Sequence, residues 1–131
     1  MKDLKNNLSV SQSLLPAEQT AAANGASADL QGFNSACVII DAGASGGTTP
    51  DFTFEIQESD DDTTFTAVAA VDLQGAEPQI TSANDNDIYR VGYIGNKRYI
   101  RAVISAVTGS SPTLLCSASI IRSHAEQAPV A

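Results

Sequence analysis

The sequence contains little of what catalysis usually requires. Its 131 residues include one histidine, His124, two cysteines and no tryptophan. His124 lies near the C-terminus in a segment without hydrophobic periodicity, so no Ser–His–acid or Cys–His arrangement has a well-placed base. The glycine-rich residues 43–47 lack the lysine and the following helix that a phosphate-binding loop needs. We therefore expect no enzyme activity, no catalytic residues and no cofactor.

Basic residues are also scarce. Seven Lys and Arg residues face fifteen Asp and Glu residues, which gives a formal net charge of −8. Proteins that bind nucleic acid through its phosphates carry a basic surface, so we expect no nucleic-acid partner. The sequence has neither the apolar core of a signal peptide nor a run of about 18 apolar residues. We therefore expect no membrane partner and synthesis in the cytoplasm.

The two cysteines and the acidic residues do not predict a metal site. Cys37 and Cys116 each lie in an apolar stretch, which favours two buried free thiols. A disulfide between neighbouring strands is the alternative, and it needs Cα atoms within about 7 Å. The acidic cluster of Glu58 and residues 60–62 does not match the spacing of an EF-hand. A solvated turn is the favoured interpretation, with a calcium site as the alternative.

What the sequence does contain is a series of strand signals separated by turn residues. Residues 51–57 alternate between apolar and polar side chains, and residues 36–42 have a continuous apolar centre, as expected where both faces of a strand are covered. Residues 43–50 are predicted to form a loop and residues 109–112 a turn. No segment shows a sustained helical stripe. The pattern predicts an all-β fold, a jelly-roll-like β-sandwich with a squat barrel as the alternative.

The clearest local signal is a predicted hairpin. Residues 88–94 and 97–106 flank Gly95-Asn96, a pair suited to a two-residue turn. This register places Arg90 directly opposite Arg101, which is unfavourable unless an acid lies between them or on a partner. An intramolecular carboxylate bridge and a basic spot at a subunit interface are the two explanations.

The N-terminal residues differ from the rest of the chain in composition and pattern. Residues 1–16 scatter a few leucines among polar side chains, in a stretch too short and too rich in Asn and Ser to hold a helix alone. We expect an extended arm over residues 1–16, a β-sandwich domain over residues 17–123 and a tail over residues 124–131. The arm would dock on a neighbour or on its own sheet. The candidate interface residues are Leu4, Leu8, Leu14, Leu15, Arg90 and Arg101.

Two segments carry a resemblance to a known group of proteins. Residues 57–68 read QESDDDTTFTAV and residues 90–101 read RVGYIGNKRYIR. Together with residues 1–8 and 15–17, they resemble small virion proteins of tailed bacteriophages and prophages, often encoded near the major capsid protein. A looser version of the same pattern is similar to discoidin-like jelly rolls, although the chain lacks their usual terminal cysteine pairing, so this second likeness concerns the fold alone.

The phage resemblance implies a structural part of the virus particle. The implied role is a decoration or cement protein that binds the major capsid protein on the capsid exterior, most often as a homotrimer. The alternatives are a head–tail connector or tail component, and a virion-borne module that binds carbohydrate or the host surface. The low aromatic content, with no tryptophan, counts against the carbohydrate alternative.

Overall fold

The computed structural model describes residues 2–126, and these residues form strands with two short 3-10 helices. The elements follow one another along the chain as η1 (Lys5–Asn7), β1 (Ser9–Gln19), β2 (Ala23–Asn24), β3 (Ala28–Asp29), β4 (Phe33–Ser59), β5 (Thr66–Ala67), η2 (Ala70–Asp72), β6 (Leu73–Gln74), β7 (Gln79–Thr81), β8 (Asp87–Tyr93) and β9 (Tyr99–Ala125). The prediction of an all-β fold is confirmed.

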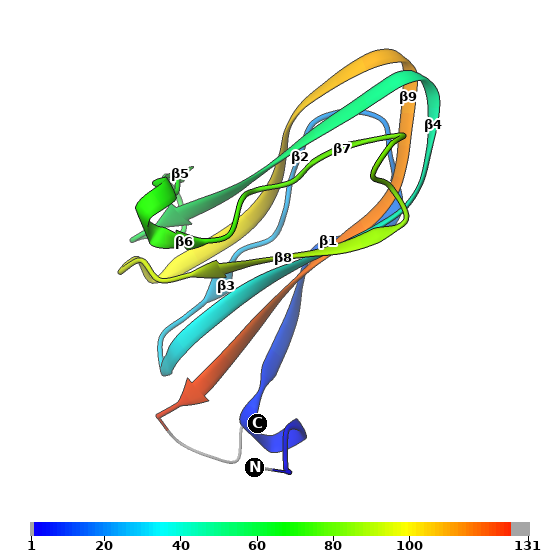
Figure 1. Cartoon of the computed structure of the whole chain (residues 1–131). Coiled ribbons are helices and arrows are strands. Elements are labelled where there is room, and N and C mark those ends of the chain that lie inside the picture. The colour runs from blue at the N-terminus through cyan, green and yellow to red at the C-terminus, as the bar shows by residue number, and fades with distance from the viewer. Residues whose placement is uncertain (1, 127–131) are drawn as a thin grey trace.

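All nine strands belong to one open antiparallel sheet. Its main path has the order β1-β9-β4-β8-β6, while β2 and β3 also pair with β9, and β5 and β7 pair with β4. The central ladder joins β4 and β9, which are 27 residues long each and pair from Phe33 with Ala125 to Ser59 with Tyr99. Figure 1 shows these two strands running side by side and folding back together at one end of the molecule.

The fold-back results from irregular pairing in the middle of both long strands. The register of β4 against β9 shifts between Ala42 and Ser45, between Gly46 and Thr48, and again before Asp51. Gly47 has a φ of 90°, and a Cβ atom there would lie 2.3 Å from the Ser111 carbonyl oxygen. Such bulges and glycines increase the local twist and let a paired ribbon bend without losing its continuity.

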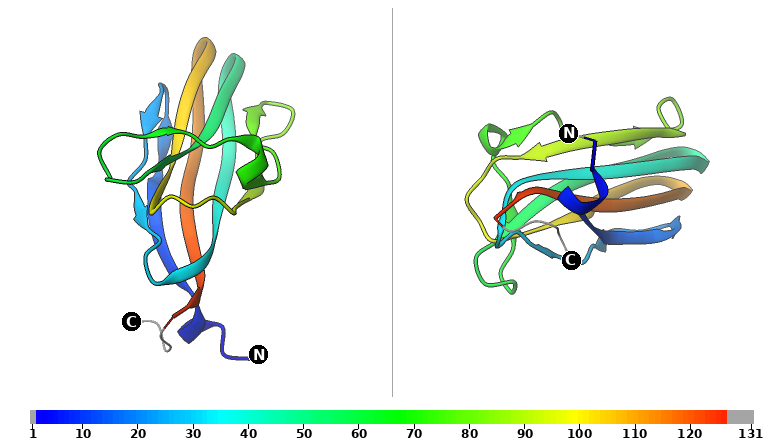
Figure 2. Two further views of the ribbon diagram at one scale, coloured as in Figure 1. Left: turned by 90° about the vertical axis from the view of Figure 1, so that its left-hand side faces the viewer. Right: turned by 90° about the horizontal axis from the view of Figure 1, so that it is seen from below.

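One hydrophobic core lies between the two halves of the bent sheet. The first half of β4 contributes Val38 and Ile40, and its second half contributes Phe52, Phe54 and Ile56, all at most 2 % exposed. Ile100, Ile104, Leu114 and Ile120 of β9, Val91 of β8 and Ile80 of β7 complete the most deeply buried part of this cluster. Figure 2, right, views the folded sheet from below, where β8, β4, β9 and β1 lie side by side.

The pairing shows one sheet in place of the predicted jelly-roll-like sandwich, and residues 9–16 of the predicted arm dock on their own sheet, which is one of the two arrangements expected for them. The strands form one hydrogen-bonded sheet, because β4 and β9 pass from one half to the other without leaving the ladder. Residues 9–16 of the predicted arm belong to β1, which pairs with β9 from Ser9 with Arg122 to Gln19 with Leu114. Pairing at a sheet edge satisfies the backbone of this polar segment, which sequence periodicity does not reveal.

The predicted hairpin around Gly95-Asn96 is wrong. Strand β8 pairs with β4, from Ala36 with Tyr93 to Ala42 with Asp87, and β4 lies between β8 and β9. The segment that follows β8 therefore crosses from one side of β4 to the other. A local turn signal was outweighed by non-local pairing with the long strand β4.

Two other predictions about connections are wrong. Residues 43–50 and 109–112 were predicted as a loop and a turn, but both lie within the long strands, at the bend. After the acidic turn, β5 pairs with residues 57–58 of β4, and the short strand β7 contains Ile80. Of the predicted tail, residues 124–125 end β9, and residues 127–131 lie outside the described residues.

Candidate interaction surface

The structure separates the four leucines of the predicted arm. Leu14 is buried in the core at 4 % exposure, and Leu8 is half-buried. Leu4 and Leu15 are exposed, at 57 % and 65 %. Leu4 and Leu15 therefore remain candidates for contact with a partner, whereas Leu14 is a core residue.

Arg90 and Arg101 are not brought together. Arg90 is exposed on β8 and pairs with Ile39, while Arg101 lies on β9 and pairs with Gln57. Arg101 donates hydrogen bonds from Nε and Nη2 to Gln57 Oε1, at 2.9 and 2.7 Å. Its guanidinium also lies 4.0 Å from the centre of the Phe65 ring. Neither predicted explanation for a close arginine pair is therefore needed, because the pair does not form.

The edge strand β1 carries the exposed apolar side chains of Val10 and Leu15. It ends the main path of the sheet and contains one charged residue, Glu18. Val10, which sequence reasoning missed, is 59 % exposed and lies on the same strand as Leu15. An edge strand offers unpaired backbone groups to another chain. The combination of an open edge and few charges makes β1 a plausible place for β-strand addition.

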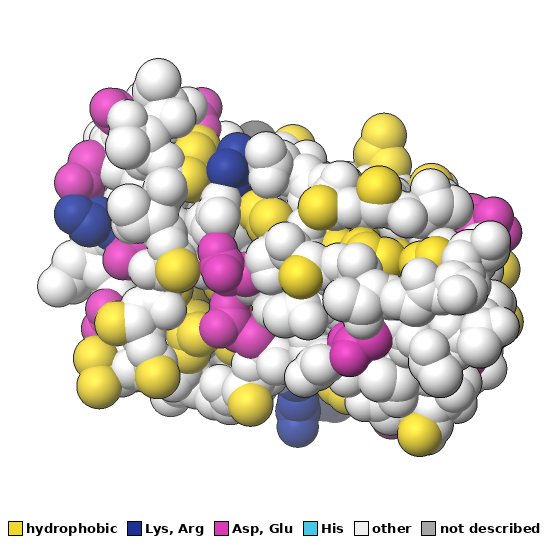
Figure 3. All heavy atoms as spheres, turned by 90° about the horizontal axis from the view of Figure 1, so that it is seen from above, with side chains coloured by type: hydrophobic (Ala, Val, Ile, Leu, Met, Phe, Trp, Pro, Cys, Tyr) yellow, Lys and Arg dark blue, Asp and Glu magenta, His cyan; other side chains and the backbone are white. Residues whose placement is uncertain are grey.

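Acidic side chains are scattered over the face of the molecule that is seen from above in Figure 3. Figure 3 looks down on this side and shows acidic groups scattered among polar and hydrophobic ones. The acidic turn after β4 is held by its own hydrogen bonds, because Asp61 Oδ1 accepts from the backbone N–H groups of Thr63 and Thr64 at 3.0 Å each. These bonds hold the pKa of Asp61 below its ordinary value. Within residues 2–126, no group of three His, Cys, Asp or Glu side chains is placed to hold a metal ion.

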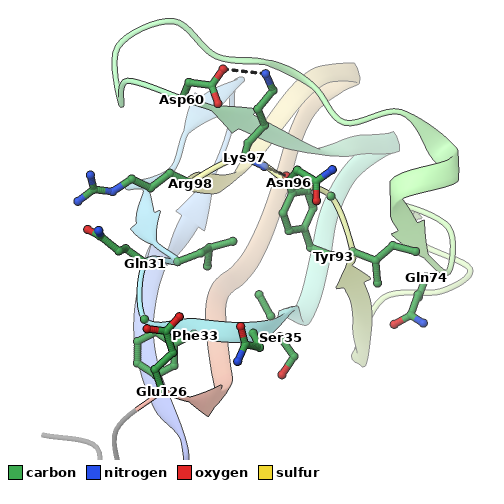
Figure 4. A pocket seen from close by; sticks show the side chains of 16 residues that line it. Gln31, Phe33, Ser35, Asp60, Gln74, Tyr93, Asn96, Lys97, Arg98 and Glu126 are labelled. Atoms are coloured by element: carbon green, nitrogen blue, oxygen red, sulfur yellow. Dashed lines mark hydrogen bonds and ion pairs between the residues drawn. The ribbon is translucent and has the colours of Figure 1, made fainter.

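A groove of about 700 Å³ opens at the end of the sheet remote from the bend. Figure 4 shows its lining, which comes from the turn between β3 and β4 and from the segment between β8 and β9. Tyr93 supports this segment: its hydroxyl donates to Glu58 Oε1 at 2.8 Å and accepts from the backbone N–H of Lys97 at 3.0 Å. Burial, and then the bond to Glu58, raise the pKa of Tyr93 well above its ordinary range. Tyr93 is therefore a neutral structural group.

Two ion pairs fix the rim of this groove. Lys97 Nζ lies 2.7 Å from Asp60 Oδ2, and Arg98 bonds both carboxylate oxygens of Asp29, at 2.9 and 2.8 Å. The Arg98 side chain holds the pKa of Asp29 below its ordinary value, mainly through this hydrogen bonding. Because both cations are already paired, the groove suits a neutral polar ligand better than an anion.

The cysteines and the histidine are not among the residues that line this groove. Cys37 pairs with Ile121 and Cys116 with Ala42 on the same ladder, several residues apart, and both thiols are free. The prediction of free thiols is confirmed, although only Cys116 is buried. His124 Nδ1 lies 2.7 Å from the Ser35 hydroxyl, a contact the sequence did not predict. Among residues 2–126, no carboxylate bonds the other ring nitrogen, which a catalytic triad would require.

Comparison with known proteins adds no relative. No protein-family model matches this sequence, and no curated protein matches it at a significant level. None of the helices in the described part of the chain is long and apolar enough to cross a membrane.

Proposed function

We propose that this protein is a capsid decoration protein of a tailed phage or prophage, which binds the major capsid protein on the outside of the head. The observation that carries the proposal is the edge strand β1, with Val10 and Leu15 exposed at 59 % and 65 % on a strand with a single charge. The sequence resemblance to small phage virion proteins suggests the major capsid protein as the partner of this surface.

The physical properties of the chain suit such a role. A net charge of −8 disfavours contact with packaged DNA, which leaves the outer surface of the shell as the place where the protein is tolerated. A bent sheet with one continuous core is a rigid body, and its open edge can accept an extended segment of a shell subunit.

The test is binding to shells assembled from the major capsid protein of the same phage or prophage. The wild-type protein should co-sediment with such shells and raise the temperature at which they disassemble. Val10→Ser and Leu15→Ser should each weaken co-sedimentation, because apolar area at the contact is lost. Val71→Ser, at an 81 % exposed apolar position on η2, is the matched control and should bind normally. Absence of wild-type binding would refute the proposal.

Copy number separates decoration from the connector or tail alternative. A decoration protein is present in many copies per particle and a connector in few, so quantitative staining of purified particles distinguishes them.

The groove favours a virion-borne carbohydrate or host-surface module as a second candidate. Its lining includes the carboxamides of Gln31, Asn34, Gln74 and Asn96, which make no side-chain hydrogen bond to another described residue. Neutral polar groups of this kind suit sugar hydroxyls. Binding to a glycan array that is lost in Asn96→Ala would support this candidate over decoration.

A further inference from the structure

The outward side of the half-sheet formed by β1, β8 and the adjoining parts of β4 and β9 carries apolar side chains next to polar ones. On β4, Val38, Ile40 and Ala42 point into the core and are at most 3 % exposed, so the residues between them point outward. These outward residues and their cross-strand neighbours include Gly92 and the polar residues Gln12, Ser117 and Ser119. We define the outer face by the apolar and charged members of the set: Val10, Cys37, Ile39, Asp41, Ile88, Arg90 and Ile121.

The register makes this face continuous. Val10 and Cys37 both pair with Ile121, so the three side chains form one row across three strands. In the next row Ile39 lies between Arg90 of β8 and Ser119 of β9, and in the row after that Asp41 lies between Ile88 and Ser117. Ile88 is 62 % exposed, and Cys37, Ile39 and Ile121 are half-buried.

An antiparallel sheet with one solvated face normally carries polar residues on that face. Residues 36–42 instead have a continuous apolar centre, the pattern of a strand covered on both sides. In the single chain, one side of this strand packs on the core while the other remains accessible to solvent. A second body on the outer face would account for the apolar side chains on this side of β4.

The charges on the face identify that body. Arg90 and Asp41 are diagonal neighbours on β8 and β4, because Arg90 pairs with Ile39, two residues before Asp41. Within residues 2–126, neither side chain makes an ion pair or a hydrogen bond to another side chain. A patch with one cation beside one anion is complementary to itself when a second copy is rotated by half a turn.

We propose that the outer face is the interface of a twofold homodimer in which Arg90 of each copy faces Asp41 of the other. The apolar residues of the face supply the contact area, and the two intermolecular charge pairs fix the register. The face carries one charge of each sign in a chain of net charge −8, so it is where two acidic copies can approach with little repulsion. This inference does not rest on the capsid function, which uses the edge of β1.

The first measurement is the mass of the purified protein by sedimentation equilibrium over a wide range of concentration. We expect twice the chain mass of 13.6 kDa at high concentration and reversible dissociation on dilution. A single-chain mass throughout, or a mass of three chains, would overturn the proposal. Shell binding is measured separately with Leu15→Ser, which lies on β1 and is not part of the outer face, so failure of one proposal leaves the other standing.

The second measurement tests the twofold pairing itself. Arg90→Asp places carboxylates at both positions of the pair, and Asp41→Arg places guanidinium groups at both, so each variant alone should dimerise at least about tenfold more weakly than wild type. In an equimolar mixture the two variants face each other with opposite charges in both pairs. The mixture should therefore form heterodimers, detected by native mass spectrometry. Mixtures that stay monomeric, or single variants that dimerise like wild type, would contradict the arrangement.

A pair of exposed apolar positions controls for the general effect of added charge. Ile88→Asp places a carboxylate on the outer face, and Val71→Asp places one on η2, away from it. Both positions are exposed, at 62 % and 81 %, so both variants should fold, which circular dichroism checks. Only Ile88→Asp should abolish the dimer; equal effects of the two variants would refute the assignment of the face.

Discussion

Ser13 connects the two halves of the bent sheet through its side chain, and replacing it with alanine tests how they are held together. The residue lies where β1 shifts register, between Gln12 and Leu14, and it is 5 % exposed. Its hydroxyl accepts the backbone N–H of Ala102 on the first half of β9 at 2.9 Å and donates to the carbonyl of Ala26 at 2.7 Å. Strand β1 itself pairs with the second half of β9.

The expected loss of stability follows from the two backbone groups that lose their hydrogen-bond partner when the Ser13 hydroxyl is removed. Ala102 is fully buried, so its N–H loses its partner without gaining water, which costs about 1–3 kcal/mol. Ala26 is exposed and its carbonyl can bind water, so only the net value of one hydrogen bond, about 1 kcal/mol, is lost there. Ser13→Ala should therefore lower the free energy of unfolding by about 2–4 kcal/mol.

The matched control lies two residues earlier on the same strand. The hydroxyl oxygen of Ser11 is buried and has no hydrogen-bond partner within residues 2–126. Removing an unsatisfied buried hydroxyl relieves its desolvation, so Ser11→Ala should leave stability unchanged within about 0.5 kcal/mol or raise it. Urea unfolding followed by circular dichroism gives both values. Equal losses in the two variants, or a loss below about 0.5 kcal/mol for Ser13→Ala, would refute the reasoning.

Three further predictions concern other positions. Gly25→Ala should destabilise the fold by about 2 kcal/mol or more in urea unfolding, because a Cβ there would lie 2.4 Å from the Ala102 carbonyl oxygen; wild-type stability would contradict this packing. Burial raises the pKa of Glu77 above its ordinary value of 4.5, so the fold favours the protonated carboxyl. Wild type should therefore gain stability relative to Glu77→Gln as pH falls from neutrality toward 4.5. If urea titrations show the difference in free energy of unfolding moving the other way, this prediction is rejected. Burial also raises the pKa of Cys116 to about 11, so thiol labelling of the folded protein, at a dilution where it is monomeric, should modify Cys37 first and Cys116 only on unfolding, as mass spectrometry would show; early labelling of Cys116 would disprove its burial.

Part of the candidate surface could be predicted from the sequence. Exposed Leu4 and Leu15 and exposed Arg90 were identified as interface candidates, because apolar or charged side chains in polar surroundings are visible in sequence alone. Leu14 could not be distinguished from Leu15, because a strand's register decides which of two neighbours points inward. Val10 was missed because strand β1 was interpreted as an arm.

The sequence by itself determined the strand content and the inward residues of the most regular segment. The alternation over residues 51–57 predicted Phe52, Phe54 and Ile56 on one side, and all three are buried. Two-residue periodicity is a local property, so it survives any choice of partner strand.

Only the tertiary structure decided which strands meet. Gly95-Asn96 is a sound local signal for a hairpin, yet β4 lies between the two strands that flank it. Residues 43–50 have the composition of a loop, yet they stay paired because residues of β9 bend with them. Pairing energy depends on non-local contacts, which no local window contains. The apolar outer face of β4 could be recognised only from sequence and structure together. Residues 36–42 show two apolar sides in the sequence, and the fold covers only one of them.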